Sequence, residues 1–311
     1  MINKGDKYIV LSFDTESDIG SWTQNYTSID IALPKILNLL KTKGVNAVFF
    51  WEGKAALHNP EMVKKTFDEG FECGCHSYQH ETVGRPSYFI PGDRAILDDE
   101  VESRIKKNLE IVEGITGERP TSFRAPRLWG DEIMIQALEK LGFIADSTYP
   151  ISSEKDELFP YHPNVSDIGK KGNLNLMEFP VMGLYKELVK NISKDLLLFR
   201  LETTGADKNI GQWPVLRLYG AEKFVELSKP FIEKQLFERQ YSIISVYQHP
   251  WEFLPMKGVV EGPEATCHLK RTLYENTGEF AFKALERMID LYLEMGFKFV
   301  TLKELTEIIG G

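Results

Sequence analysis

The chain has 311 residues, of which 42% are hydrophobic and 12% aromatic, enough to bury a large core as one big domain or two small ones. Its formal net charge of −9 argues against a nucleic-acid-binding protein, which normally needs a basic face. The sequence has no apolar run near the ~20 residues that a membrane-spanning helix requires, so we expect no membrane span.

The N-terminus and the cysteines bear on the compartment. Residues 1–7 lead straight into a strand, without the apolar stretch and cleavage site of a secretory signal. Three cysteines are too few for a disulfide framework, which favours a reducing compartment. Both features predict a cytoplasmic protein. They do not predict its oligomeric state.

Strand-like and helix-like segments alternate along the first half of the chain. Apolar runs bounded by glycine or proline predict strands, and apolar residues at helical spacing predict helices. The predicted strands are 8–13, 45–51, 71–75, 122–124 and 143–146. The predicted helices are one from residue 33 that ends before Gly44, one at 60–69, a long one from residue 101 that ends at 114–117, and one at 131–141.

The second half continues this alternation less regularly. Two stretches, 151–174 and 253–276, lack clean periodicity and are interpreted as long loops or excursions from the domain. Because no low-complexity linker interrupts the chain, we expect one domain over residues 1–311. The predicted strands are 177–181, 242–248 and 297–301, and the predicted helices are 221–240, 280–295 and 302–309.

Repeated βα units predict an α/β fold with a parallel sheet, either open and doubly wound or closed into a barrel. The carboxyl ends of all strands of a (β/α) barrel meet at one rim, whereas an open sheet brings together only residues near its switch point. Ionisable residues follow five separate strands, which favours a single (β/α) barrel, irregular or incomplete with about 7–8 strands, and an active site at the C-terminal strand ends. These residues are Asp14 with Glu16, His76, Arg124, Asp146 and His249.

His76 and His80 form half of a possible metal site. Their spacing of four residues would place both imidazoles on one face of a helical turn, within reach of one divalent ion. A catalytic zinc usually takes three protein ligands, so a third must come from elsewhere. Asp14 and Glu16 are residues i and i+2 after the first strand and can point into one pocket. One carboxylate could then bind metal while the other handles protons.

Cys73 and Cys75 precede His76 and could suggest a thiolate zinc site. Strand alternation places the two cysteines on the face opposite His76. We therefore expect both to be small core residues under a helix.

Five short motifs follow one another in order between residue 8 and about residue 255. With these motifs the chain resembles the polysaccharide deacetylases of carbohydrate esterase family four, the NodB-homology group. The His-Pro-Trp-Glu sequence in the last motif is similar to that of the exopolysaccharide-associated members. The motifs are residues 12–16 (Ser-Phe-Asp-Thr-Glu), 72–80 (Glu-Cys-Gly-Cys-His-Ser-Tyr-Gln-His), 123–126 (Phe-Arg-Ala-Pro), 146–148 (Asp-Ser-Thr) and 246–252 (Val-Tyr-Gln-His-Pro-Trp-Glu).

The resemblance implies a metal-dependent hydrolase that removes N-acetyl groups from an N-acetylated sugar or glycan and releases acetate. A divalent metal, zinc by preference, is expected on Glu16, His76 and His80. Asp14 is expected to be the general base that takes a proton from water. His249 is expected to be the general acid that protonates the departing amine.

Two further residues are expected, by the same resemblance, to support the base and the acid. Arg124 would pair with Asp14 and keep it in place and ionised at neutral pH. Asp146 would orient His249 and support its charged form.

Pro126, Arg127 and Trp251 are the expected substrate-binding residues. A backbone N–H near Arg127 would stabilise the oxyanion, and the ring of Trp251 would stack on a sugar. Many relatives carry an aromatic residue where this chain has Arg127. The charge at this position indicates an anionic group on the substrate.

Glu16 also departs from the family pattern, which usually has aspartate there. The extra methylene moves the carboxylate by ~1.5 Å and could alter the choice of metal, with Asp18 as a second oxygen ligand on the same loop. Two alternatives therefore stay open. One is a metal-independent hydrolase of cyclic amides, of the allantoinase type with a similar fold. The other is a carbohydrate-binding protein without activity.

Overall fold

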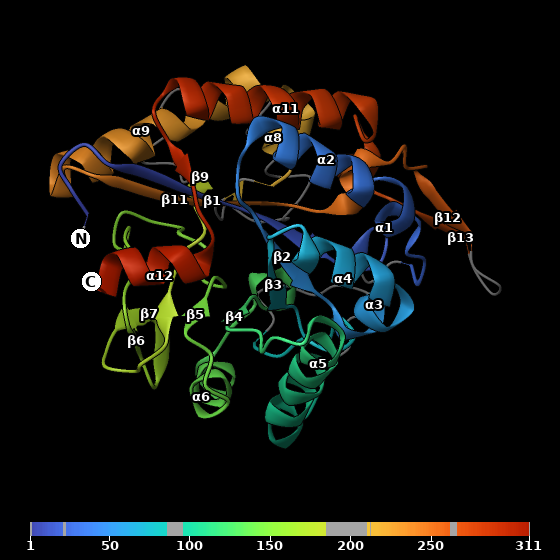
Figure 1. Cartoon of the computed structure of the whole chain (residues 1–311), viewed down its shortest axis with the longest axis horizontal. Helices are drawn as coiled ribbons and strands as arrows, with labels where there is room; N and C mark the ends of the chain where they lie inside the picture. The colour runs from blue at the N-terminus through green and yellow to red at the C-terminus, as the bar shows by residue number, and fades with distance from the viewer. Residues whose placement is uncertain are drawn as a thin grey trace.

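A parallel sheet forms the centre of the protein, and helices surround it (Figure 1). The computed structural model describes residues 2–20, 23–85, 96–184, 210–211, 213–261 and 266–310. Eight strands in these ranges form the sheet, in the order β11-β1-β2-β3-β4-β5-β8, with β14 also paired to β1. Their bounds are β1 (Lys7–Thr15), β2 (Val48–Trp51), β3 (Glu72–Cys75), β4 (Ser122–Phe123), β5 (Ala145–Asp146), β8 (Met177–Glu178), β11 (Ser242–Gln248) and β14 (Lys298–Phe299).

The strand β1 is the central strand of the sheet. It pairs in parallel with β11 along residues 7–13 on one side. On the other side it pairs with β14 at residues 8–9 and with β2 at residues 12–15. Eight of its nine residues are buried, as expected for a parallel strand that is covered on both faces.

The two edge strands of the sheet approach each other without forming a ladder. Beyond the end of β8, the backbone N–H of Met182 donates to the carbonyl of Ser245 in β11 at 2.9 Å. The hydroxyl of Ser147 also lies 3.2 Å from that of Ser245. The sheet is therefore curled into an incomplete (β/α) barrel, and this prediction from the sequence is confirmed.

Helices follow most of the strands and cover the outside of the sheet. In α2, Pro34 lies in the first turn and Gly44 ends the helix in the left-handed conformation. The carboxylate of Asp131 accepts two backbone N–H groups at the start of α6. The bounds are α1 (Thr27–Ile31), α2 (Leu33–Lys43), α3 (Gly53–His58), α4 (Pro60–Asp68), α5 (Val101–Thr116), α6 (Glu132–Lys140), α8 (Val215–Tyr219), α9 (Ala221–Arg239), α10 (Arg271–Tyr274), α11 (Glu279–Glu294) and α12 (Leu302–Gly310).

The helix α11 packs against three other helices, and the described helices were also searched for one that could cross a membrane. Figure 1 shows α11 lying across the same side of the molecule as α8, α9 and α2, and the contacts of α11 include all three. Among the helices described, not one combines the length and the apolar character that crossing a bilayer would take.

The two predicted excursions contain small hairpins. The first carries β6 (Pro163–Asn164) and β7 (Asp167–Lys171), and the second carries β12 (Val259–Glu261) and β13 (Thr266–His268). Residues 262–265 of the second excursion lie outside the described residues. A further pair is β9 (Gly183–Leu184) with β10 (Ile210–Gly211). In Figure 1, β12 and β13 project from the body of the molecule at the right.

The core and the surface follow the sequence pattern. Cys73 and Cys75 are buried in the main hydrophobic core, as predicted, and burial raises the pKa of the Cys73 thiol to about 12.

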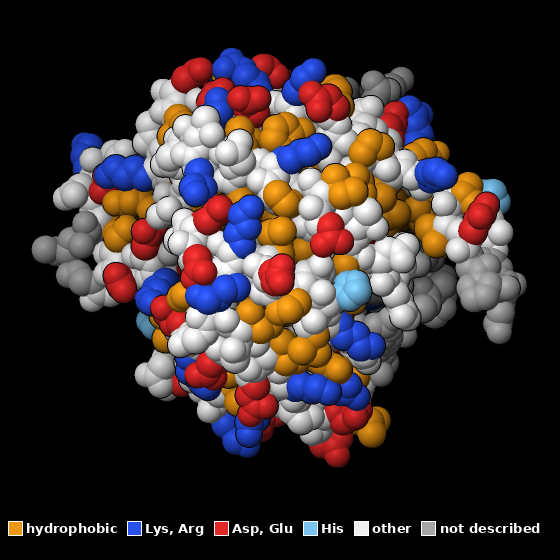
Figure 2. Space-filling model, turned by 45° about the vertical axis from the view of Figure 1, so that its right-hand side comes forward, with side chains coloured by type: hydrophobic (Ala, Val, Ile, Leu, Met, Phe, Trp, Pro, Cys, Tyr) orange, Lys and Arg blue, Asp and Glu red, His pale blue; other side chains and the backbone are white. Residues whose placement is uncertain are grey.

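Figure 2 shows acidic and basic side chains interspersed over the described part of the face that it presents.

Candidate active site

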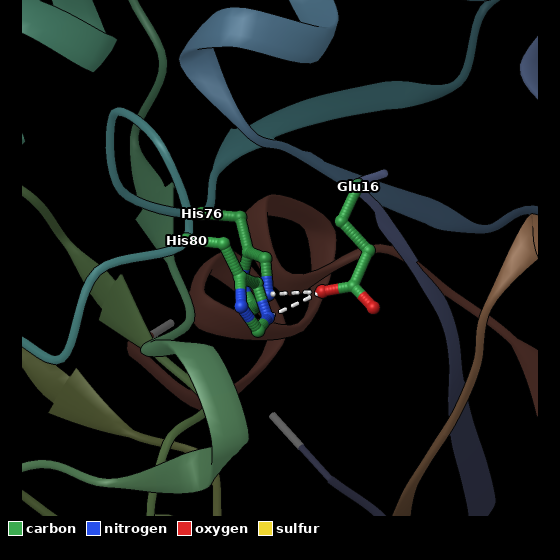
Figure 3. A group of neighbouring side chains, drawn as sticks. All are labelled: Glu16, His76 and His80. Carbon is green, nitrogen blue, oxygen red and sulfur yellow. Dashed lines mark ion pairs between the residues drawn. The ribbon is translucent and has the colours of Figure 1, made fainter. Parts of the chain in front are cut away.

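Glu16, His76 and His80 converge at the carboxyl ends of β1 and β3. The Nε2 atom of His80 lies 2.5 Å from Oε2 of Glu16, and that of His76 lies 3.5 Å from the same oxygen (Figure 3). One ligand atom from each of the three residues lies within 4.8 Å of the others. All three side chains are buried, so their chemistry is set by one another rather than by water.

The hydrogen bond of His76 fixes which nitrogen faces Glu16. Its Nδ1 atom lies 2.8 Å from the carbonyl oxygen of Arg124, which can only accept, so Nδ1 carries the proton. The lone pair of Nε2 then points to Oε2 of Glu16, a buried oxygen that receives no hydrogen bond. A nitrogen lone pair and a carboxylate oxygen directed at one point need a cation between them. This donor set fits a divalent metal of the zinc type.

The ionisation of these groups suits metal ligands. Burial opposes ionisation of Glu16, but the charge of His80 and the polar contacts of the carboxylate with His76 and His80 outweigh it, so the pKa of Glu16 lies well below its usual range. Burial lowers the pKa of His80 despite the attraction of Glu16. An ionised carboxylate and a neutral imidazole are the forms that bind a metal.

The two histidines lie on a turn and not on a helix, so that part of the sequence prediction was wrong. Ser77 and His80 have left-handed backbones, with φ of 59° and 55°. The carboxylate of Glu81 accepts from the hydroxyl of Ser77 at 3.1 Å and from the backbone N–H of residue 79 at 2.6 Å. This turn still brings the two imidazole rings within 5.3 Å of each other. The left-handed backbone of His80 is a strained conformation for this residue type, and such strain is common in active sites.

Gly20 and Trp251 enclose the carboxylate of Glu16. Gly20 has φ of 60°, and a Cβ atom there would lie 3.2 Å from Oε1 of Glu16. The indole N–H of Trp251 donates to the same oxygen at 3.2 Å. Because Trp251 is only 2% exposed and stacks on His249, its ring is not the open sugar platform that the sequence suggested.

Arg124 and Asp14 form the ion pair that was predicted. Nη1 of Arg124 donates to Oδ1 of Asp14 at 2.9 Å and to the hydroxyl of Ser12 at 2.6 Å. Its Nε and Nη2 atoms donate to the backbone and hydroxyl oxygens of Ser147. Arg124 is fully buried, so the guanidinium is held rigidly and fixes the orientation of Asp14.

His249 faces both carboxylates of the first motif. Its Nε2 atom lies 4.0 Å from Oδ2 of Asp14 and 3.9 Å from Oε1 of Glu16. Burial disfavours the charged imidazole, but the hydrogen bond to Glu252 and the charges of Glu16, Glu252 and Asp14 outweigh it. The pKa of His249 is therefore raised above its usual value.

Glu252 is a site residue that the sequence reasoning missed. Its Oε1 atom lies 3.0 Å from Nδ1 of His249 and accepts the backbone N–H of the same residue at 2.9 Å. Its Oε2 atom accepts from Nε of the buried Arg217 at 3.0 Å. A sequence signal existed, because a glutamate three residues after the first residue of a helical turn is the pattern of a capping box.

Asp146 does not contact His249, which corrects the predicted orienting role. Its Oδ1 atom accepts from the hydroxyl of Thr148 at 2.6 Å. On the neighbouring strand its partner in register is Glu178. Burial raises the pKa of Asp146 to about 6, and burial with the charge of Asp146 raises that of Glu178 further. We infer that the pair retains a proton which the two carboxyl groups can share.

Asp18, the second oxygen ligand that the sequence offered, serves a different purpose. Its two carboxylate oxygens accept the backbone N–H groups of Thr27 and Ser28, at the start of α1. The carboxylate is thus committed to the helix and is not part of the group around Glu16.

A pocket of about 190 Å³ opens over these groups. Arg127 lines this pocket from the short helical turn that Pro126 begins. Its backbone is in the left-handed conformation, with φ of 61°. Nη1 of Arg127 also lies 3.4 Å from the carbonyl oxygen of His80. Pro126 itself is buried. The pocket is lined by Asp14, Glu16, Ile19, Gly20, His76, His80, Arg127, Leu128, Trp213, Tyr247, His249, Trp251 and Leu273.

Comparison with known sequences finds similarity to polysaccharide and peptidoglycan deacetylases. Residues 2–145 match the family model described as polysaccharide deacetylase. The chain is 25% identical over 205 residues to a peptidoglycan deacetylase from Helicobacter pylori, covering 61% of this chain and 64% of the relative. It is 26% identical over 166 residues to a peptidoglycan-N-acetylmuramic acid deacetylase from Bacillus subtilis, covering 51% and 55%. The chain thus spans less than two thirds of the length of these curated relatives.

Solved structures share the fold. A Mycobacterium smegmatis protein, provisionally named a polysaccharide deacetylase, matches with a TM-score of 0.62 and 17% identity, over 99% of this chain and 91% of the other. The PuuE allantoinase matches with a TM-score of 0.61 and 14% identity over the same shares. At these identities the likeness extends to the fold alone.

Proposed function

We propose that the protein is a divalent-metal-dependent N-deacetylase, a proposal that the match of residues 2–145 to the polysaccharide deacetylase family model supports. Its substrate is an N-acetylated sugar or glycan, and its products are acetate and a free amino group. The observation that carries the proposal is the meeting of Glu16, His76 and His80 in one pocket with Asp14 and His249.

We propose zinc as the metal, held by Glu16, His76 and His80. Two imidazoles and one carboxylate are a common catalytic zinc set. When bound, the ion would polarise the amide carbonyl and lower the pKa of water in the pocket. The hydrogen bond from Nδ1 of His76 to a backbone carbonyl would keep its other nitrogen available as a ligand.

Asp14 is the proposed general base. One of its carboxylate oxygens is held by Arg124, and the other faces His249 across the pocket. This second oxygen is the one that would take the proton from the attacking water. The fixed guanidinium keeps the base oriented without a cost in reorganisation during the reaction.

His249 is the proposed general acid. Its raised pKa favours the protonated form near neutral pH, and its Nε2 atom points to the place where the base and the ligands meet. Protonation of the amine lets the C–N bond of the tetrahedral intermediate break. A backbone N–H near Arg127 is the proposed oxyanion donor, with the side chain of Arg127 beside the substrate and the buried Pro126 at the start of the turn that carries it.

Other features of the proposal rest on the sequence pattern. Residues 249–252 support membership of the exopolysaccharide-associated subtype, and the core that spans strands from β1 to β14 supports one domain over residues 1–311. The guanidinium of Arg127 supports a substrate with an anionic group. Metal-independent cleavage of cyclic amides would leave the lone pairs around Glu16 without a cation, so we favour the metal-dependent reaction.

The test is acetate release from a panel of N-acetylhexosamine substrates, including chitooligosaccharides and peptidoglycan fragments. We expect zinc-loaded protein to release acetate, and chelation or either of the variants His76→Ala and Asp14→Asn to abolish the release. Undiminished release by a variant or by the metal-free protein would contradict the proposal. Turnover of a cyclic ureide by protein without metal would support the alternative.

A further inference from the structure

We propose that Glu252, anchored by Arg217, is the positioning residue that holds the acid His249. This inference rests on the proposed deacetylase function, because it gives a partner to the acid of that reaction. It moves the orienting role from Asp146 on β5 to a glutamate only three residues after the histidine itself.

Glu252 holds His249 at two points with a single oxygen. Oε1 lies 3.0 Å from Nδ1 of the ring and 2.9 Å from the backbone nitrogen. A carboxylate only accepts, so Nδ1 must carry a proton, and Nε2 is the nitrogen left to exchange a proton in the pocket. The ring is also stacked on Trp251, with 5.0 Å between the centroids. Rotation of the ring would break the Nδ1 hydrogen bond and this stacking.

Arg217 supplies the counter-charge that Glu252 needs in a buried site. Glu252 is fully buried and Arg217 is 1% exposed. Besides the 3.0 Å contact with Glu252, the guanidinium donates to the backbone carbonyls of Thr272 and Glu275. Every nitrogen of the guanidinium is therefore used, and α8 is tied to the segment before α11. A buried carboxylate without such a partner would take up a proton and lose its hold on the imidazole.

A positioned acid matters only when the leaving group needs a proton. An amine leaves from a tetrahedral intermediate only after it is protonated, whereas an aryloxide leaves without a proton. Loss of the Glu252 contact should therefore slow amide hydrolysis and leave hydrolysis of an activated aryl acetate nearly unchanged. General damage to the pocket would slow both reactions.

The experiment compares Glu252→Gln, Glu252→Asp and Arg217→Lys with the zinc-loaded wild type. On an N-acetylated chitooligosaccharide we expect Glu252→Gln to lower kcat by about 10²-fold or more, with KM within about threefold. On p-nitrophenyl acetate we expect kcat to change by less than about threefold. The conservative variants Glu252→Asp and Arg217→Lys should each lose less kcat on the amide than Glu252→Gln does. Glu139→Gln, a carboxylate-to-amide change at a site that caps residues 175 and 176, is the matched control.

Two results would overturn the inference. One is an equal loss of kcat in Glu252→Gln on the chitooligosaccharide and on p-nitrophenyl acetate, and the other is a wild-type kcat of Glu252→Gln on the chitooligosaccharide. A second readout does not depend on activity, because the Nδ1 proton of His249 can be followed by ¹H–¹⁵N NMR. We expect a protected downfield Nδ1–H signal in the wild type that is lost in Glu252→Gln.

Failure of the deacetylase proposal is distinguishable from failure of this one. A wild-type protein that releases no acetate from any substrate contradicts the proposed function, and the NMR signal then decides the pairing. Loss of the signal in Glu252→Gln supports the hold on His249, and its persistence overturns it.

Discussion

The indole N–H of Trp251 donates to Oε1 of Glu16, while Oε2 of the same carboxylate faces the two imidazoles. The two oxygens of Glu16 thus have separate partners. An aspartate has a shorter reach, so the glutamate at this position and the tryptophan that binds it are matched. The glutamate at a position where the deacetylases that the chain resembles usually have aspartate therefore has a structural counterpart in Trp251.

Removal of this indole N–H should weaken metal binding. Partners that orient a metal ligand typically contribute 10–100-fold to affinity, so we expect Trp251→Phe to raise the Kd for zinc by about that factor. Competition with a chromophoric chelator measures this Kd. The control is Trp213→Phe. Trp213 also lines the pocket, and its ring contacts those of His249 and Trp251, so the same substitution is made there without changing the hydrogen bond to Glu16. Equal zinc affinity in Trp251→Phe and the wild type would show that the hydrogen bond does not orient Glu16.

Loss of Arg124 should destabilise the fold as well as the site. Arg124→Met would leave Asp14 as a buried charge without a partner, at an expected cost of about 3–5 kcal/mol in the free energy of unfolding. Urea denaturation of chelator-treated protein measures this cost apart from metal binding. Asp14→Asn in the Arg124→Met background should recover part of the stability.

The exposed ion pair of Lys64 and Asp68 is the matched comparison for this change. Both side chains are about half exposed, so Lys64→Met should cost less than about 1 kcal/mol. A cost for Arg124→Met no larger than that for Lys64→Met would contradict the account of the buried pair.

The carboxyl pair of Asp146 and Glu178 should make stability depend on pH. Both pKa values are raised in the folded protein, that of Asp146 to about 6, so the folded state binds more protons than the unfolded state. The contribution of the pair to stability therefore falls as the pH rises above about 4, through the pKa of Asp146 near 6 and on through the higher pKa of Glu178. Glu178→Gln gives Asp146 a permanent N–H donor, and we expect this variant to lose less stability over the same range. Urea denaturation at several pH values tests this, and an unchanged slope in Glu178→Gln would refute a shared proton.

The raised pKa of His249 predicts the alkaline side of the activity profile. An acid must be protonated to act, so kcat/KM should fall as the pH rises through a pKa above the usual 6.5. Since Glu252 contributes to the raised pKa, the alkaline limb should move to lower pH in Glu252→Gln. A limb that stays in place would indicate that another group controls it.

The strands and the site could be predicted from the sequence to different extents. Parallel pairing buries strands such as Lys7–Thr15 on both faces, so they appear as apolar runs that end in polar residues, and the convergence of these ends follows from the barrel. The contact of Arg124 with Asp14 was found in this way. The cytoplasmic location stays a prediction.

Residues that act through local turns were harder to place. The spacing of His76 and His80 suits a helix, but the turn between them depends on left-handed backbones and on the carboxylate of Glu81, which spacing does not reveal. The partner of His249 was sought on another strand at Asp146, although a glutamate within the same turn was closer. Local hydrogen bonds to the backbone decide such cases, and they compete with any pattern based on strand ends.

The measurement that tests the central claim most directly is the zinc content of the purified protein after zinc loading and removal of excess metal, by elemental analysis. We predict one ion per chain in the wild type and less than about a tenth of that in His76→Ala with His80→Ala, since a catalytic zinc needs about three protein ligands. Full zinc occupancy in this double variant, or none in the folded wild type, would contradict a metal centre at Glu16, His76 and His80.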